Sequence, residues 1–209
     1  MGTSSKLLDS TLASDRPLIL GILNITPDSF SDGGCFDSIE SACRHAELMV
    51  EEGADIIDVG GESNRPGSEG IDAAVEVRRV SPILEALSER LPSHVLLSVD
   101  TNKAAVADAA ITIGAKLIND TSGGGSRELL NLVAGSEVGL VLMHMQGTPA
   151  TMQDDPAYED VVREVQSFLE SRVIAAIEAG VESERIIIDP GIGFGKTRAH
   201  NLVLIGHLR

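Results

Sequence analysis

Polar side chains that could do chemistry recur at the carboxyl ends of short apolar segments. The apolar runs are Leu18–Leu23, Ile56–Val59, Val95–Val99, Leu117–Ile118, Leu140–Met143 and Ile186–Ile188. The polar residues at these ends are Asn24, Asp58, Asp100, Asn119 with Asp120, His144 and Asp189. Carboxylates and amides accept hydrogen bonds from N–H donors and supply the oxygen ligands that Mg²⁺ prefers. One such residue could be a helix cap, but six in succession favour a functional site.

The segments between the apolar runs have the composition and length of amphipathic helices. They cover Ser38–Glu52, Ile71–Leu91, Lys103–Ile113, Ser126–Ala134 and Tyr158–Ala179. Strands that alternate with helices of this length predict an α/β fold with parallel strands and crossover helices. The carboxyl ends of such strands share one face, where active sites lie. The alternation alone leaves two folds open, a doubly wound open sheet and an incomplete barrel of about six βα units.

Three junctions place a glycine directly after a predicted helix, at Gly53, Gly114 and Gly180. Only glycine enters the left-handed conformation of a helix cap without a steric penalty, so these glycines predict helix ends. No linker or shift in composition divides the chain, and we expect residues 1–209 to form a single domain.

Composition excludes several classes of protein. The net charge is −16 and no Lys/Arg stripe is present, which argues against binding to nucleic acid or to an anionic membrane. Cys35 and Cys43 are too few for a disulfide framework and match no zinc pattern. The N-terminus has no apolar signal segment, and no apolar run approaches the roughly 20 residues that span a bilayer. A cytoplasmic location is therefore expected.

The segment 191–197, GIGFGKT, resembles two nucleotide-binding motifs without matching either. Pro190 stands where a Walker A loop requires its first glycine, and Lys196 stands where the dinucleotide fingerprint requires its third. We therefore expect neither nucleotide hydrolysis nor NAD binding.

Six segments, in order, resemble the signatures of the dihydropteroate synthase family. They are GILNITPDSFSDGG at 21–34, IIDVGGESNRPG at 56–67, SVDT at 98–101, IND at 118–120, MHMQGTP at 143–149 and DPGIGFGKT at 189–197. The resemblance implies a TIM barrel and a transferase of folate biosynthesis. That family condenses 6-hydroxymethyl-7,8-dihydropterin diphosphate with p-aminobenzoate, giving 7,8-dihydropteroate and pyrophosphate, and sulfonamides compete for the aminobenzoate position.

The resemblance also assigns residues to the diphosphate end of the substrate. Asn24 would be the Mg²⁺ ligand beside the diphosphate, and Arg65 would bind the diphosphate and take part in catalysis. Asn64 stands where the family commonly has Thr, and it would also contact the diphosphate. A planar guanidinium suits phosphate oxygens because it can donate paired hydrogen bonds.

The pterin end is assigned in the same way. The implied pterin-binding residues are Asp100, Asn119, Met143, Asp189 and Phe194, and Asp100 would in addition stabilise the positive charge that develops in catalysis. Thr26, Pro27 and Phe30 would belong to a loop on the aminobenzoate side that closes over the site.

The family continues with a seventh strand that carries a Ser-Arg-Lys motif and an eighth that carries an Arg-x-His motif. The chain has neither, so we expect a partial barrel, truncated at its C-terminus, that is a poor catalyst alone. One alternative is a non-catalytic pterin-binding fragment or half of a split enzyme. Another is a folate-dependent methyltransferase, against which the 26–30 loop and Arg65 argue. Family members are commonly dimers, and a homodimer of this chain stays open because the helices involved are largely absent.

Overall fold

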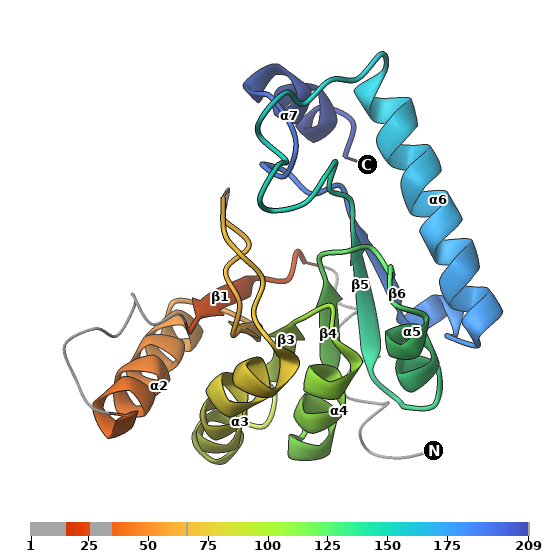
Figure 1. The fold of residues 1–209 in the computed structure, drawn as a ribbon. Helices are drawn as coiled ribbons and strands as arrows, with labels where there is room; N and C mark the ends of the chain where they lie inside the picture. Colours follow the sequence, from red (N-terminus) through yellow and green to blue (C-terminus); the bar gives the residue numbers. More distant parts are fainter. Residues whose placement is uncertain (1–15, 26–34, 66, 209) are drawn as a thin grey trace.

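The structure is a computed structural model that describes residues 16–25, 35–65 and 67–208, and the side chains of all of these except 35–38. Within this part of the chain, strands and helices alternate (Figure 1). The elements are β1 (Leu20–Asn24), α2 (Cys35–Glu51), β2 (Ile56–Gly60), α3 (Ala73–Arg90), β3 (Leu96–Asp100), α4 (Ala104–Ile113), β4 (Leu117–Asp120), α5 (Arg127–Ala134), β5 (Gly139–Met143), α6 (Val161–Ala179), η2 (Ser183–Arg185), β6 (Ile186–Asp189) and α7 (Arg198–Ile205).

All predicted helices form, with ends that differ by a few residues from those expected. The helix expected from Tyr158 begins at Val161, because the Asp160 side chain accepts a hydrogen bond from the Arg163 N–H and caps the first turn. Asp72 caps α3 in the same way, so that helix begins at Ala73. Gly53, Gly114 and Gly180 have φ of 110°, 128° and 103°, which confirms the predicted helix ends.

The described strands form one parallel sheet in the order β1-β2-β3-β4-β5-β6. A doubly wound sheet reverses its strand order at a switch point, whereas a barrel adds each strand beside the preceding one. The sequential order therefore favours the barrel over the open doubly wound sheet. The sheet is curved, and the helices follow one another around its outside (Figure 1).

The two faces of the sheet have different partners. The face toward the helices carries the main core, in which Ile57, Val59, Val99 and Leu140 pack against helix side chains. The opposite, inner face carries a small apolar cluster of Ile56, Leu96, Leu117 and Val141. Side chains alternate between faces along a strand, so residues two and four positions beyond this cluster also face inward. Asp58, Ser98, Asp100, Asn119 and Met143 therefore lie on the inner face.

Among the described residues, no helix combines the length and apolar character needed to cross a membrane.

Candidate functional site

A cavity that combines polar side chains with apolar surface opens at the carboxyl ends of the strands. Its volume is about 250 Å³. It is lined by Ile22, Asn24, Ser63, Asn64, Arg65, Asp100 and Phe194. Five of these residues are site residues that the sequence predicted, and they come from β1, β3 and the loops after β2 and β6. Segments far apart in the sequence thus meet at one end of the sheet.

Strand register explains how the cavity is built. Asn24 pairs with Gly60, Gly60 with Asp100, and Asp100 with Asn119, so these residues form one row across four strands. The row has a gap at Gly60. A Cβ there would lie 3.0 Å from Asn24 Oδ1 and 3.7 Å from Asp100 Oδ2. Glycine therefore leaves the space over which the Asn24 and Asp100 side chains face each other.

Two carboxylates lie on the inner face, Asp100 in the cavity lining and Asp58 two positions before the end of β2. Asp58 is 2% exposed and accepts hydrogen bonds from Ser98 Oγ at 2.5 Å and Asn119 Nδ2 at 2.8 Å. Burial raises the pKa of Asp58, and these two hydrogen bonds partly offset the rise. The pKa of Asp100 is raised well above its ordinary value by burial and then by the charge of Asp58. The ionised form of Asp100 is therefore not stabilised by a nearby cation among the described residues. This is expected of a carboxylate whose hydrogen-bond donor is supplied by a ligand.

The loop after β2 brings two predicted diphosphate residues to the cavity. Asn64 Nδ2 donates to Asp100 Oδ2 at 2.7 Å, which fixes the Asn64 amide against the end of β3. Arg65 is exposed at the cavity wall, and its backbone N–H donates to Ser63 Oγ at 3.3 Å. The guanidinium is thus presented to solvent beside the cavity.

Three predicted pterin residues lie outside the lining of this cavity. Asn119 adjoins it through the row and directs its amide N–H toward Asp58. Met143, 3% exposed, and Asp189 are paired in register on β5 and β6. Asp189 Oδ1 accepts a hydrogen bond from the Gly191 N–H at 2.7 Å and so shapes the loop that carries Phe194. The cavity and these residues share the inner face and the same end of the sheet.

Lys196, which belongs to the segment GIGFGKT, forms its hydrogen bonds within the protein. Its ammonium group donates to the carbonyl oxygens of Gly191 and Phe194, each at 2.9 Å, and lies 2.9 Å from His144 Nδ1. Lys196 is 3% exposed. Burial lowers its pKa to about 8, and burial together with the Lys196 charge lowers the pKa of His144 to about 4. The lysine therefore joins the loops after β5 and β6.

The aminobenzoate-side loop is outside the described residues. Thr26, Pro27 and Phe30 fall within the segment 26–34. Their predicted role stays a prediction from the sequence.

The donor set near the cavity fits a metal ion held mainly by its substrate. No group of three or more His, Cys, Asp and Glu side chains in the described part of the chain could hold a metal alone. Asn24 offers one amide oxygen at the cavity, which Arg65 also lines. Mg²⁺ keeps several waters and is commonly bound by one or two protein oxygens together with substrate phosphates. The residues present fit that arrangement.

Sequence reasoning missed residues that hold the site in place. Asp58 was counted among strand-end residues, but it lies inside β2, where it binds Asn119 across 61 positions of sequence. Lys103 is predicted only as the start of a helix, yet it forms ion pairs with Glu62 and Glu76. The available signal was a carboxylate inside the motif 56–67 and a lysine two positions after the motif 98–101.

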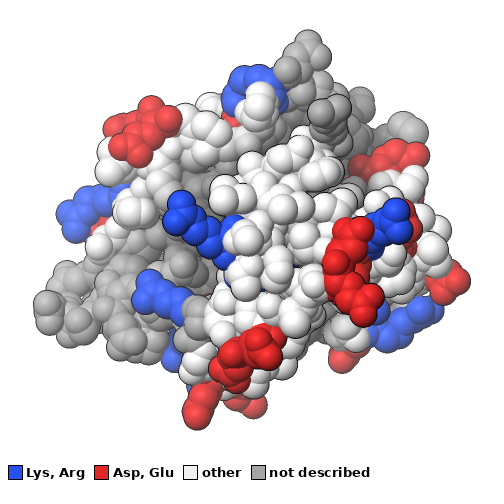
Figure 2. All heavy atoms as spheres, turned by 90° about the horizontal axis from the view of Figure 1, so that it is seen from above, with Lys and Arg blue, Asp and Glu red and all other residues white. Residues whose placement is uncertain are grey.

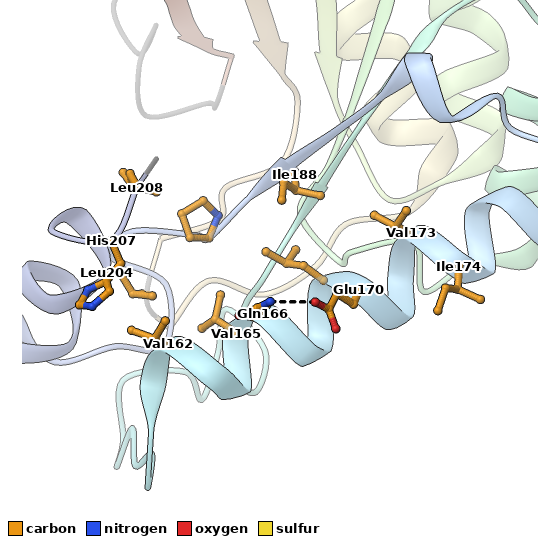
Figure 3. A pocket seen from close by; sticks show the side chains of 12 residues that line it. Val162, Val165, Gln166, Glu170, Val173, Ile174, Ile188, Leu204, His207 and Leu208 are labelled. Atoms are coloured by element: carbon orange, nitrogen blue, oxygen red, sulfur yellow. Dashed lines mark hydrogen bonds between the residues drawn. The ribbon is translucent and has the colours of Figure 1, made fainter.

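A larger groove lies elsewhere, between α6, β6 and α7 (Figure 3). Its volume is about 1000 Å³, and Val165, Ile188 and Leu204 are among its mainly apolar lining residues. The groove contains none of the predicted site residues. Its lining is mainly apolar, with Gln166, Glu170 and His207 as its polar or ionisable side chains.

Figure 2 looks onto the end of the molecule where the strands finish. On this face, acidic and basic side chains are interspersed, and some Lys and Arg side chains lie near the middle.

Comparison with known proteins defines the class first. Residues 20–209 match the family described as pterin binding enzyme. This match covers every described strand of the sheet and the row of amides and a carboxylate at their carboxyl ends, so the class is that of the pterin-binding enzymes.

The individual relatives identify the family within this class of pterin-binding enzymes. A dihydropteroate synthase of Escherichia coli K12 is 43% identical over 199 residues, covering 95% of this chain and 70% of the relative. A crystal structure of the Yersinia pestis dihydropteroate synthase with a sulfonamide drug complex has a TM-score of 0.85 and 44% identity, covering 92% and 70%. The Xanthomonas albilineans enzyme in complex with 7,8-dihydropteroate has a TM-score of 0.79 and 43% identity, covering 93% and 68%. The chain belongs to the dihydropteroate synthase family.

Membership confirms two predictions made from the motifs. The fold is that of the α/β TIM barrels to which the structural relatives belong. The family is one of transferases that make dihydropteroate, which confirms the predicted enzyme class. The chain spans about 70% of the length of the Escherichia coli relative.

Proposed function

We propose that the cavity between β1, β3 and the β2–α3 loop holds the diphosphate end of 6-hydroxymethyl-7,8-dihydropterin diphosphate, with the pterin ring toward β4–β6. The observation that carries the proposal is that Asn24, Asn64, Arg65, Asp100 and Phe194 line one cavity. The Xanthomonas albilineans relatives bound to 4-aminobenzoic acid and to 7,8-dihydropteroate support small-molecule substrates of this kind.

At the pterin end, Asp100, Asn119 and Asp189 would accept hydrogen bonds from ring N–H and amino groups. The amide N–H of Asn119 already donates to Asp58, so its oxygen is the group left to accept from a ligand. Met143 and Phe194 would supply apolar walls for the ring. The raised pKa of Asp100 supports a ligand-facing role, because a donor or cation there would restore the ionised form.

At the diphosphate end, Arg65 would donate paired hydrogen bonds to phosphate oxygens, and Asn64 would donate a further one. Mg²⁺, held by Asn24 and the diphosphate, would neutralise charge on the leaving group. The arrangement of Asn24 and Arg65 on one cavity supports this assignment.

The reaction exchanges one bond for another at the pterin methylene carbon. The amine nitrogen of p-aminobenzoate forms a bond to this carbon, the C–O bond to the diphosphate breaks, and pyrophosphate leaves with the electron pair. The amine then loses a proton. Arg65 would stabilise the departing anion, and ionised Asp100 would stabilise the positive charge that develops on the pterin side. Thr26, Pro27 and Phe30 would exclude water on the aminobenzoate side.

The whole chain would act as one unit. We propose that residues 1–209 form a single pterin-binding domain, since one continuous sheet runs from β1 to β6. A homodimer is compatible with this proposal, and sedimentation velocity would measure it directly.

The first experiment measures pyrophosphate release from the pterin diphosphate by the purified chain, with Mg²⁺, in the presence and absence of p-aminobenzoate. Aminobenzoate-dependent release that falls at least about 100-fold in Arg65→Ala supports the proposal. The matched control is Arg163→Ala, whose side chain is 87% exposed on α6 and lies outside the cavity.

A second candidate function is pterin binding without turnover, supported by the inner-face carboxylate and amide groups of Asp100 and Asn119, which could bind a pterin without any catalytic step. Calorimetric titration separates the two. Binding of 6-hydroxymethylpterin without pyrophosphate release would identify a binding fragment or half of a split enzyme. A folded chain that binds neither pterin nor pyrophosphate would refute both functions.

A further inference from the structure

A lysine beside the cavity bridges two carboxylates. Lys103 Nζ lies 2.6 Å from Glu62 Oε2 and 2.6 Å from Glu76 Oε2. The Lys103 side chain is 23% exposed, that of Glu62 16% and that of Glu76 0%. The attraction between charges that are shielded from water in this way is stronger than between exposed charges, because screening by solvent and salt is weak there.

This bridge ties three parts of the fold together. Glu62 stands at the start of the β2–α3 loop, Glu76 in the first turn of α3, and Lys103 at the cap of α4. Glu62 Oε2 also accepts a hydrogen bond from the Ile71 N–H at 2.8 Å, near the other end of the loop. The two ends of the loop are therefore held at one point.

The loop that is held in this way carries two residues of the cavity. Residues 61–72, here called the clamped loop, include Asn64 and Arg65. Lys103 follows Asp100 by three positions, so the bridge fixes the loop relative to the end of β3. The Asn64–Asp100 hydrogen bond of 2.7 Å lies at this junction.

The bridge is poorly explained as a device for stability alone. Glu76 Oε1 is buried and has no hydrogen-bond partner within the described residues, which costs free energy. A buried ion pair of this kind often contributes less to stability than apolar side chains of the same volume, and its best-attested benefit is a defined geometry.

We propose that Lys103 is a positioning residue, which holds the clamped loop so that Asn64 stays against Asp100 and Arg65 stays at the cavity wall, where both bind the anionic end of the substrate. The inference rests on the proposed function, because it assigns Arg65 to the diphosphate. Lys103 itself touches no ligand in this arrangement.

The test separates anion binding from pterin binding in Lys103→Met. Calorimetry would measure the affinity of the chain for inorganic pyrophosphate with Mg²⁺ and, separately, for 6-hydroxymethylpterin, which has no phosphate. We expect pyrophosphate affinity to fall roughly tenfold, since small misplacements of binding groups cost factors of this order. Affinity for 6-hydroxymethylpterin should stay within about twofold of the native value.

Two further variants sharpen the result. Lys103→Arg keeps a cation between the carboxylates and should restore most of the pyrophosphate affinity. Lys116→Met removes a lysine that directly precedes β4 and takes no part in the bridge. This control variant should change neither affinity. If Lys103→Met fails to fold, Glu62→Ala cuts the same bridge at its partly exposed end and should give the same split.

Outcomes that overturn the inference are distinct from those that overturn the proposed function. Equal losses for both ligands, or no loss for pyrophosphate, would mean that the bridge only stabilises the fold. Hydrogen exchange should be faster at the amides of the clamped loop in Lys103→Met, and unchanged exchange there would also refute the role of Lys103. If the native chain binds 6-hydroxymethylpterin but Arg65→Ala leaves pyrophosphate affinity intact, the diphosphate assignment fails first.

Discussion

Replacing Gly191 by alanine tests the packing of the loop that carries Phe194. Gly191 has φ of 65°, and an ideal Cβ there would lie 1.9 Å from the carbonyl oxygen of His144 and 3.2 Å from Met143 Cγ. Ordinary contact begins near 3.4 Å, so either the loop or the end of β5 must move by about 1.5 Å, the difference between these distances. The obstacle is backbone, which cannot rotate aside as a flexible side chain can.

The cost follows from the two effects combined. A left-handed φ costs alanine about 1–2 kcal/mol relative to glycine. A shift of this size would also break hydrogen bonds at the junction, among them His144 N–H to the Asp189 carbonyl at 2.9 Å and Lys196 Nζ to the Gly191 carbonyl at 2.9 Å. At about 1 kcal/mol for each, and with steric strain added, we expect Gly191→Ala to lower the free energy of unfolding by about 4 kcal/mol.

Gly193 in the same loop is the matched control. Its φ is 90°, so alanine is strained there as well, but no atom lies within 4 Å of an added Cβ. Gly193→Ala should therefore lose only about 1–2 kcal/mol. Urea unfolding followed by far-UV circular dichroism suits the measurement, because the sequence has no Trp. Equal losses in the two variants would refute the steric reasoning and leave backbone conformation as the whole effect.

Three further predictions concern buried ionisable groups. Lys196→Met should lower the free energy of unfolding by about 2–4 kcal/mol, because the carbonyls of Gly191 and Phe194 lose their hydrogen-bond donor. Urea titration measures this loss, and the control variant Lys116→Met should leave the free energy of unfolding nearly unchanged. The pKa of His144 is lowered from 6.5 to about 4, so the unfolded chain binds the extra proton, and stability should fall by about 2–3 kcal/mol as pH drops through that window. His144→Gln should remove that slope, and an unchanged slope would assign it to other groups. The raised pKa of Asp100 gives a pH dependence of the opposite sign, because here the folded chain binds the proton more tightly than the unfolded chain. Its contribution to stability is present at about pH 4 and is lost as pH rises through the raised pKa. Asp100→Asn should flatten that part of the pH profile, and a profile parallel to the native one would contradict the assignment.

Much of the fold follows from the sequence because its signals are local. Apolar runs separated by amphipathic segments predicted the strands and helices, and glycines such as Gly114 and Gly180 marked helix ends through a conformation that only they adopt freely. The row of polar residues at the strand ends predicted the site for the same reason. Parallel strands bring their carboxyl ends together whatever the details of packing.

What the sequence could not predict depends on pairing across the sheet. Asp58 contacts Asn119 because β2 and β4 are separated by one strand and both side chains lie on the inner face. The two residues are 61 positions apart in the sequence, so no local sequence pattern predicts this contact. Lys103 looked like the start of a helix, and only the packing of α3 beside α4 brings it to Glu76. Helix ends differed where a cap such as Asp160 decided the first turn.

The order of the strands has a consequence for cooperativity. In the described part of the chain, the main contacts join elements that are neighbours in sequence, so the βα units form a line with β1 and β6 at its ends. In a linear array the end units have one neighbour and the central units two, and the free energy of local opening rises from the ends to the middle. Asn24 belongs to the end unit at β1, whereas Asp100 and Asn119 belong to the middle of the line. A ligand that contacts all three residues links the least protected unit to the most protected ones, so its binding energy also restrains fraying at β1.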